Sequence, residues 1–281
     1  MENIAIISSS KDAAGANTRS SLIELFGFES IGEKFDDADV MQFNKIEGKK
    51  IRLYLINEDL IFAENIDKRI SADIYIFASK HRSKENTPSF AVHSIGNWRK
   101  AEFGGKEKAL CPCSAILLKN LYLSLMQNSH FFGKSADFEL TMEATHHGPY
   151  MEKPAVFVEI GSTEKEWNDK QNGDVIAKTI MGALEREREN QNYESCVVLG
   201  GTHYTQAGNK AMGRTNYAVG HVCPKYALEH LDEEMLLQAI SKTIPNPKIV
   251  LLDWKGLGKE KQKILNLLKN IKMEFKRIDK I

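Results

Sequence analysis

The amino-acid sequence predicts an α/β protein, with a single interwoven domain built around a mixed sheet. Short apolar runs alternate along the 281 residues with amphipathic segments, as expected where strands and helices alternate. A hydrophobic content of 42% and a charged content of 27% are ordinary for a chain with one large core. The sequence contains no internal repeat, low-complexity segment or linker rich in Pro, Gly or Ser. We therefore expect residues 1–281 to form one domain.

The strands of this sheet are predicted from apolar runs of strand length. In chain order they are Ile4–Ile7, Ile51–Ile56, Ile74–Ala78, Phe90–His93, Phe138–Glu143, Ala155–Ile160, Cys196–Leu199 and Ile249–Leu252. The polar and basic stretch Lys80–Pro88 is predicted to be a loop.

Four amphipathic segments are predicted to be helices, namely Ser114–Met126, Glu164–Arg188, Asp232–Thr243 and Lys259–Asn270. The second has the apolar stripe of a helix that packs on a sheet, formed by Val175, Ile176, Thr179, Ile180, Ala183 and Leu184. At its start, Thr163 and Glu166 have the spacing of a capping box, in which a hydroxyl and a carboxylate satisfy free backbone amides.

Composition also limits the class of protein. No stretch approaches the roughly 18 to 20 apolar residues that span a bilayer. The N-terminus has an acidic Glu2 and only a short apolar run, and is predicted to be a buried strand rather than a signal peptide. Four cysteines do not suggest a disulfide framework, so a reducing cytoplasm is the expected location.

The formal net charge of zero hides an uneven distribution. From Lys255 to Ile281 there are nine Lys or Arg and three Asp or Glu, a balance of +6, so the remaining residues sum to −6. For this tail, a solvated helix face is favoured over contact with RNA. A neutral protein can still bind a phosphate backbone where its basic groups share one face.

The eight histidines are also distributed unevenly. Five lie at or just past the end of a strand and near a glycine-containing turn, namely His93, His146, His147, His203 and His221. In open α/β sheets ligands bind outside the carboxyl ends of strands, so these side chains are expected to converge. The other three, His81, His130 and His230, lie in polar loop or helix contexts, where a surface position is expected.

The segment Glu143–Tyr150 is the strongest candidate for chemistry. Adjacent side chains of a strand point to opposite faces, so His146 and His147 can share a site only if the chain turns, and Gly148-Pro149 supplies a turn. Glu159 interrupts an otherwise apolar strand, where a carboxylate must be paired, ligated or protonated. The alternatives are buried structural histidines and an ion pair of Glu159 with a core Lys or Arg.

Two further segments close strands. Leu199–Thr205 contains Gly200 and Gly201, whose backbone amides could approach a phosphate or an oxyanion closely. Val92–Trp98 places a histidine, an asparagine and a tryptophan on one loop. Trp98 is a candidate for stacking an unpaired base, with a half-buried packing role as the alternative.

Histidines and carboxylates that converge on one pocket suit a catalytic Zn²⁺, which takes about three protein ligands and leaves a position for water. The ion lowers the pKa of water from about 15.7 to about 7, which gives hydroxide at neutral pH. The sequence has no H-E-x-x-H motif, and Cys111-Pro-Cys113 lacks a partner pair at zinc-finger spacing. A metal site is therefore a hypothesis that no single motif specifies.

Taken together, these segments resemble the archaeal-type D-aminoacyl-tRNA deacylases, a family that also occurs in plants. The most specific part is Thr145-His-His-Gly-Pro149, together with the strand Val158-Glu-Ile-Gly-Ser162. The similarity extends nearly end to end, through Ser8–Asn17, His93–Asn97, Glu143–Pro149, Ala155–Ser162, Gly200–His203, Gly220-His221 and Asp253–Gly256.

The resemblance implies a phosphorylase- or peptidyl-tRNA-hydrolase-like fold and hydrolysis of the ester between a D-amino acid and the terminal ribose of tRNA. It also implies zinc as cofactor, with up to two ions per chain. The expected catalytic residues are Glu143, His146, His147, Thr202 and His203. The expected substrate-binding residues are Lys11, Asn17, Asn97, Trp98, Gly200 and Gly201. The expected metal ligands are His93, Glu159, His203 and His221.

The expected partner is the acceptor stem and 3′ end of D-aminoacyl-tRNA, bound by a monomer without a membrane. Basic residues near the His93 segment are expected to border the cleft, namely Lys80, Arg82, Lys84, Arg99, Lys100, Lys106 and Lys108. One rival interpretation is a hydrolase or phosphorylase that acts on a small nucleoside or peptide. Another is a non-catalytic RNA-binding module that uses Trp98 and the basic tail, which would leave the strand-end histidines without a role.

Overall fold

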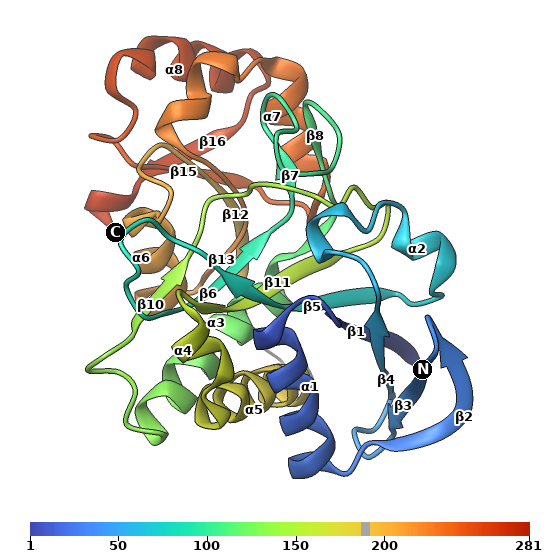
Figure 1. Ribbon diagram of the computed structural model, residues 1–281. Coiled ribbons are helices and arrows are strands. Elements are labelled where there is room, and N and C mark those ends of the chain that lie inside the picture. Colours follow the sequence, from blue (N-terminus) through green and yellow to red (C-terminus); the bar gives the residue numbers. More distant parts are fainter. Residues whose placement is uncertain (187–191) are drawn as a thin grey trace.

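The computed structural model describes residues 1–186 and 192–281 and contains two main sheets (Figure 1). The larger is a mixed sheet of β1 (Glu2–Ser9), β2 (Glu29–Phe35), β3 (Ala38–Phe43), β4 (Lys49–Ile56), β5 (Ile74–His81), β6 (Ser89–Ser94), β10 (Glu139–Met142) and β11 (Ala155–Gly161). Its strand order is β10-β6-β11-β5-β1-β4-β3-β2. The strands β4, β1, β5 and β11 run parallel, whereas β6 is antiparallel to β11.

The smaller main sheet has four parallel strands in the order β13-β12-β15-β16. They are β12 (Glu194–Leu199), β13 (Tyr217–Cys223), β15 (Ile249–Leu252) and β16 (Glu274–Arg277). Two short pairs complete the strands, β7 (Gly96–Asn97) with β8 (Ala109–Leu110), and β9 (Cys113–Ser114) with β14 (Thr243–Ile244). The four-stranded sheet lies in the upper part of Figure 1, below α8 (Lys261–Asn270).

The α-helices are α1 (Ala13–Phe26), α2 (Ile66–Arg69), α3 (Ala115–Phe131), α4 (Glu164–Asn168), α5 (Lys170–Arg186), α6 (Gln206–Arg214), α7 (Glu233–Ser241) and α8 (Lys261–Asn270). Short 3-10 turns lie at Leu60–Phe62, Lys225–His230, Gly258–Glu260 and Ile278–Lys280. None of the helices within residues 1–186 and 192–281 is both long and apolar enough to cross a membrane.

The two faces of the larger sheet have different coverings. On one face, Ile6, Ile76 and Val158 pack in one apolar core with residues of α1, α3 and α5. The same core reaches the smaller sheet through Val198 and Val219, so α3 and α6 join the two sheets. On the other face, Phe77 and Phe157 belong to a separate core with the segment that contains the 3-10 turn Leu60–Phe62 and α2. This second face is covered by loops, and the polar side chains described below lie on it.

The structure confirms the α/β class, the mixed sheet and all eight predicted strands. The helix predicted at Glu164–Arg188 begins with the expected capping box, but Asp169 adopts an extended backbone and divides it into α4 and α5. Its predicted end at Arg188 lies outside the described residues. The prediction missed α1, α6, β2, β3, β13 and β16.

Candidate metal and catalytic site

The register of three neighbouring strands places His81, Glu159 and His93 on the face of the larger sheet that faces away from α1, α3 and α5. In β5 and β11, Phe77 pairs with Phe157 and Ser79 with Glu159. In β11 and β6, Phe157 lies opposite His93, and the two rings stack with centroids 5.2 Å apart. Side chains paired across strands, and those two residues apart along a strand, share a face.

Glu143 joins this group because it follows β10, the partner of β6. Its backbone amide donates to Val92 O at 3.0 Å, which extends the parallel pairing by one residue and brings Glu143 beside His93. The side chain of Glu143 is fully buried. A carboxylate in such a position is costly unless positive charge or a metal ion lies next to it.

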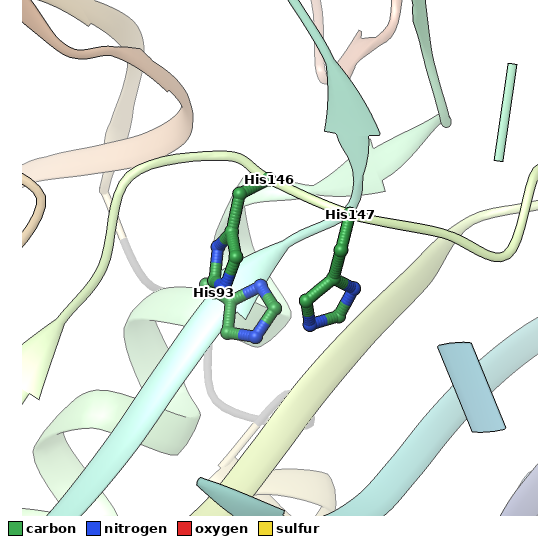
Figure 2. A group of neighbouring side chains, drawn as sticks. All are labelled: His93, His146 and His147. Atoms are coloured by element: carbon green, nitrogen blue, oxygen red, sulfur yellow. The ribbon is translucent and has the colours of Figure 1, made fainter. Parts of the chain in front are cut away.

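A turn of the backbone brings the adjacent histidines together, as the sequence predicted. His147 has a positive φ of 45°, a conformation that non-glycine residues seldom adopt outside tight turns and functional sites. As a result the rings of His146 and His147 lie with their centroids 4.3 Å apart instead of on opposite faces. Figure 2 shows both rings directed toward His93, which projects from β6.

Backbone carbonyls fix the orientation of these three rings. Nδ1 of His93 contacts Ser94 O at 3.1 Å, Nδ1 of His146 contacts Ala144 O at 2.8 Å, and Nδ1 of His147 contacts Gly148 O at 2.6 Å. A carbonyl oxygen only accepts, so each Nδ1 carries the hydrogen and each neutral ring keeps a lone pair on Nε2. Each Nε2 is thereby left for the cluster, an arrangement usual for histidines that ligate metals.

The two carboxylates lie between the histidines. Oε1 of Glu143 is 3.3 Å from Nδ1 of His81, and Oε2 is 3.5 Å from Nε2 of His203 and 3.9 Å from Nε2 of His146. Oε2 of Glu159 is 3.4 Å from Nδ1 of His81 and 3.6 Å from Nε2 of His93. None of the contacts of Glu143 has the alignment of a hydrogen bond, and Nε2 of His93 is also buried without a partner.

The electrostatic environment divides the histidines into two classes. Burial lowers the pKa of His81, but contact with Glu159 and the charge of Glu143 outweigh it and raise the pKa to about 9. The same balance raises the pKa of His93. Burial, with the positive charge of His93, lowers the pKa of His147 to about 3 and holds that of His146 well below its ordinary value. His146 and His147 are therefore neutral near pH 7, which leaves the lone pair of each ring available to a metal ion.

Within residues 1–186 and 192–281, three sets of side chains have ligand atoms within 4.8 Å of one another, close enough to hold a metal ion. They are His93, His146 and His147; Glu143, His146 and His203; and His81, Glu143 and Glu159. The first and the third have no residue in common, so two ions per chain fit the geometry. The unpaired atoms of Glu143 and His93 have the nitrogen and oxygen chemistry that Zn²⁺ prefers. The donor set therefore fits the metal that the resemblance implies.

The cluster opens to solvent through a cavity of about 440 Å³, a size typical of small-ligand sites. Its walls include His81, His146, His147, Glu159 and His203, and at its edge lie Lys80, Arg82 and the exposed Phe62 and Phe103. A smaller cavity of about 260 Å³ adjoins it beneath the loop that carries Arg99 and Lys100.

The structure thus brings together six predicted residues, namely His93, Glu143, His146, His147, Glu159 and His203. It also adds His81, for which the sequence predicted a surface position. That prediction was wrong because β5 continues to His81 instead of ending at Ala78. The signal was the alternation of Tyr75, Phe77, Ser79 and His81, which places all four on one face.

Other predicted site residues lie elsewhere or are engaged in the fold. His221 is buried on β13 with Nδ1 3.2 Å from Thr145 Oγ1, and it belongs to none of the three candidate metal sets found among the described residues. Burial lowers its pKa to about 3. The amide of Gly200 already donates to Cys223 O at 2.8 Å, so it is not free for an oxyanion.

The three amide and indole donors predicted to bind substrate are also occupied. Trp98 is only 3% exposed and its indole N–H donates to Val222 O, so its faces are not open for stacking a base. Asn97 donates to Gly104 O and Lys106 O and holds the loop after β7. Asn17 donates to Trp167 O and Asp169 O, which ties α1 to the α4–α5 junction. Lys11 is exposed near the cavity edge, where its carbonyl accepts from Nζ of Lys80.

Comparison with known proteins agrees with the resemblance of the motifs. A family model described as D-aminoacyl-tRNA deacylase matches residues 68–276, most of the chain. The chain belongs to the D-aminoacyl-tRNA deacylase family. It is 34% identical over 266 residues to the D-aminoacyl-tRNA deacylase of Archaeoglobus fulgidus, covering 93% of this chain and 91% of the relative. It is 37% identical over 246 residues to that of Methanocaldococcus jannaschii, covering 84% and 91%.

A solved structure shares the whole fold of this D-aminoacyl-tRNA deacylase family member. The crystal structure of the conserved protein of unknown function AF0625 superposes with a TM-score of 0.88 at 31% identity, covering 100% of this chain and 96% of the other.

Two of the motifs that carry the family resemblance have structural roles at the site's border. Asp12 caps α1 by accepting from Gly15 N and also accepts from Ser79 Oγ and Lys80 N, which fixes the end of β5 next to His81. Asp253 accepts from Gly256 N, and the loop that they form packs against Gly201.

Proposed function

We propose that this chain hydrolyses the ester bond of D-aminoacyl-tRNA, releasing the D-amino acid and free tRNA. The observation that carries the proposal is the buried cluster of histidines and carboxylates at the base of an open cavity, in a chain of the D-aminoacyl-tRNA deacylase family. An aminoacyl ester is already activated, so a positioned water and stabilisation of the tetrahedral oxyanion suffice for rapid hydrolysis.

The chain's own residues have distinct roles in this scheme. His147, neutral and oriented by Gly148 O, lines the cavity and is the candidate group to accept a hydrogen bond from the attacking water. Glu143 and His203 lie on the other side of the cluster and orient that water. Gly201 and Thr202, next to His203, are the candidates for donors to the oxyanion.

The zinc would be held by the three sets of ligands described above, of which the second shares His146 with the first and Glu143 with the third. Their members are His81, His93, Glu143, His146, His147, Glu159 and His203. Bound Zn²⁺ supplies Lewis acidity that lets water ionise near neutral pH. The same carboxylates hold positive charge on His81 and His93 when no ion is present, because two buried carboxylates need compensating charge.

The surface around the cavity favours a polyanionic substrate over a small nucleoside or peptide. Lys80 and Arg82 border the main cavity, and Arg99 and Lys100 border the adjoining one. We infer that a monomer of this cytoplasmic enzyme binds the tRNA acceptor stem along this edge, with the 3′ end entering between the two cavities. Lys108 is less available than expected, because it forms an ion pair with Asp232 at 2.7 Å, and Lys106 lies over the ring of Tyr150.

The purified protein should release amino acid from D-Tyr-tRNA or D-Asp-tRNA far faster than from the corresponding L-aminoacyl-tRNAs. A deacylase that spared neither enantiomer would destroy the substrates of translation, so a wall of the cavity must misplace the L side chain. The measurement is the first-order rate of deacylation of each radiolabelled ester at equal enzyme concentration. Equal rates on both enantiomers would leave a general esterase and contradict chiral selection.

Replacing both Arg82 and Lys84 by alanine should raise KM for D-aminoacyl-tRNA more than it lowers kcat. Both side chains are exposed, and the guanidinium of Arg82 rests 5.1 Å from the ring of Trp167 at the cavity edge. Phosphate contacts act on ground and transition states alike, and each contact adds to the salt dependence of binding. The measurement is KM over a salt series for both proteins, and the salt dependence should be smaller for the double variant.

A matched control replaces Lys272 and Lys280, two exposed lysines of the C-terminal tail, by alanine. These changes should leave KM and its salt dependence unaltered if that tail is only a solvated surface. An increase of KM in the tail variant, with none in the Arg82/Lys84 variant, would move the tRNA contact to the C-terminal tail.

A further inference from the structure

A further cavity of about 490 Å³, called the second cavity below, lies on the four-stranded sheet and is distinct from both cavities described above. It shares one wall, His203, with the catalytic cluster. It is lined by Gly201, Thr202 and His203 after β12, by Tyr226 after β13, and by Leu257 and Lys259 after β15. The three strands run parallel, so the cavity lies outside their carboxyl ends, where ligands bind in open α/β sheets. Of the residues that line this cavity, only Gly201, Thr202 and His203 have a role in the hydrolysis proposed above.

His203 connects this cavity to the catalytic cluster through opposite sides of one ring. Its Nε2 lies 3.5 Å from Oε2 of Glu143, while its Nδ1 lies 3.4 Å from the hydroxyl of Tyr226. His203 also lines the main cavity, which contains His146 and His147. A ligand that crosses the ring of His203 therefore extends from the catalytic cluster into the second cavity without a break.

The walls of the second cavity suit a flat, polar aromatic ring on a sugar. Tyr226 leaves 48% of its surface exposed, which offers an aromatic face for stacking, and Leu257 gives an apolar wall. Carboxylates of Glu229 and Glu260 at the border can accept from an exocyclic amino group. Lys225 and Lys259 supply positive charge for a phosphate.

Close packing of loops keeps the base of this cavity in place. A Cβ on Gly256 would come within 2.2 Å of Gly201 N, and a Cβ on Gly201 would come within 2.9 Å of the Asp253 carboxylate. Asp253 N donates to Leu199 O, and Lys225 N donates to Gly201 O at 2.8 Å. The loops after β12, β13 and β15 are thus joined by backbone contacts, so the cavity is formed before a ligand arrives.

We propose that the second cavity binds the terminal adenosine of the tRNA, the nucleoside whose ribose carries the aminoacyl ester. The proposal rests on the deacylase function proposed above. In the substrate, the ester bond joins an amino acid to a nucleoside. In the protein, His203 stands between the main cavity and the second cavity. With the ester at His203, the amino acid enters the main cavity beside Phe62 and Phe103, and adenine stacks on Tyr226. Adenine on Tyr226 replaces the stacking role that the sequence predicted for the buried Trp98.

Adenosine 5′-monophosphate is the probe for this site, with ribose 5-phosphate as the matched ligand that lacks the base. Calorimetry should show AMP binding, and ribose 5-phosphate should bind at least about tenfold more weakly because stacking of the base is lost. AMP should also inhibit deacylation of D-Tyr-tRNA competitively. Absence of AMP binding at millimolar concentration, or inhibition that is not competitive, would overturn the assignment.

Three variants locate the binding. Tyr226→Ala should weaken AMP at least about tenfold, whereas Tyr226→Phe, which keeps the ring, should bind AMP within about twofold of the parent protein. Phe275→Ala removes a similarly exposed aromatic (42%) of the same sheet outside the cavity, and should leave AMP affinity unchanged. Equal AMP affinity in Tyr226→Ala and the parent protein would contradict stacking on Tyr226. Because calorimetry does not depend on turnover, a protein that deacylates D-Tyr-tRNA but binds no AMP refutes this inference alone, and one without deacylase activity refutes the proposed function.

Discussion

Replacing Glu143 by glutamine is expected to lower kcat for D-aminoacyl-tRNA at least about a hundredfold. Glu143 contacts three histidines of the cluster, His81, His146 and His203. It is also the carboxylate that two of the candidate metal sets have in common. Glutamine keeps the shape of the side chain but removes the charge that orients water and balances a metal ion. Catalysis should therefore fall while the backbone arrangement persists.

Stability separates this loss from simple unfolding. The side chain of Glu143 is fully buried and neither of its oxygens has a hydrogen bond, so burying its charge costs folding free energy that the positive charge of His81 and His93 repays only in part. The melting temperature of the metal-free Glu143→Gln protein should equal or exceed that of the metal-free parent protein. Loss of activity with higher stability is the pattern expected of a residue selected for function.

The matched control is Glu139→Gln, the same substitution at the exposed start of the same strand, β10. It should change neither kcat nor the melting temperature by a measurable amount. Wild-type turnover in Glu143→Gln would show that Glu143 is a structural residue and would move the catalytic role to Glu159.

The sequence was most informative where hydrophobic runs are long. Strands such as Ala155–Gly161 are buried on both faces and carry long apolar runs, here interrupted only by Glu159, so their existence was predictable. The segment Tyr217–Cys223 was missed because Gly220 and His221 interrupt its pattern. Gly220 is required there by tertiary packing, since a Cβ would come within 2.3 Å of Thr243. Such a contact between distant segments leaves no local signal.

Helix α1 was missed for a related reason. Its sequence is rich in small and hydroxyl residues, and Gly15 lies so close to β5 that a Cβ would come within 2.6 Å of Ala78 O. Close packing on a sheet replaces the large apolar residues on which a periodic pattern depends. The family motif Ser8–Asn17 thus encodes a tight helix–sheet contact as well as the border of the site.

The sequence predicted most residues of the candidate site, but it also assigned to the site residues that the structure places elsewhere. His146 and His147 were expected to share a site because a turn follows them, and the positive φ of His147 provides that turn. His221 was expected at a strand end, but it lies inside β13 (Tyr217–Cys223) and contacts Thr145, whereas His203, past the end of β12 in the same sheet, reaches the cluster. Which strand ends meet depends on the strand order, and the sequence does not give that order.

Removal of metal is expected to abolish most of the activity and to lower stability. Purified protein should contain one to two Zn²⁺ per chain by elemental analysis, because two of the candidate sets have no residue in common. Dialysis against a strong chelator should lower kcat at least about a hundredfold, and added Zn²⁺ should restore it. A ligand that binds only the folded state also stabilises it, by about 2.7 kcal/mol at a hundredfold excess over Kd. The melting temperature should therefore fall with the metal and rise again with Zn²⁺.

His147→Gln tests whether the predicted ligands hold that metal, independently of turnover. Nδ1 of His147 is held by Gly148 O, so Nε2 is the atom that faces His93 and His146, and glutamine cannot present an imidazole nitrogen there. The variant should contain less Zn²⁺ than the parent protein and should gain less thermal stability when Zn²⁺ is added. His130→Gln, an exposed histidine at the end of α3, is the matched control and should keep the full metal content. Equal zinc content in His147→Gln and the parent, with kcat still reduced, would make His147 the group that accepts a hydrogen bond from the attacking water and leave the metal to Glu143, His146 and His203.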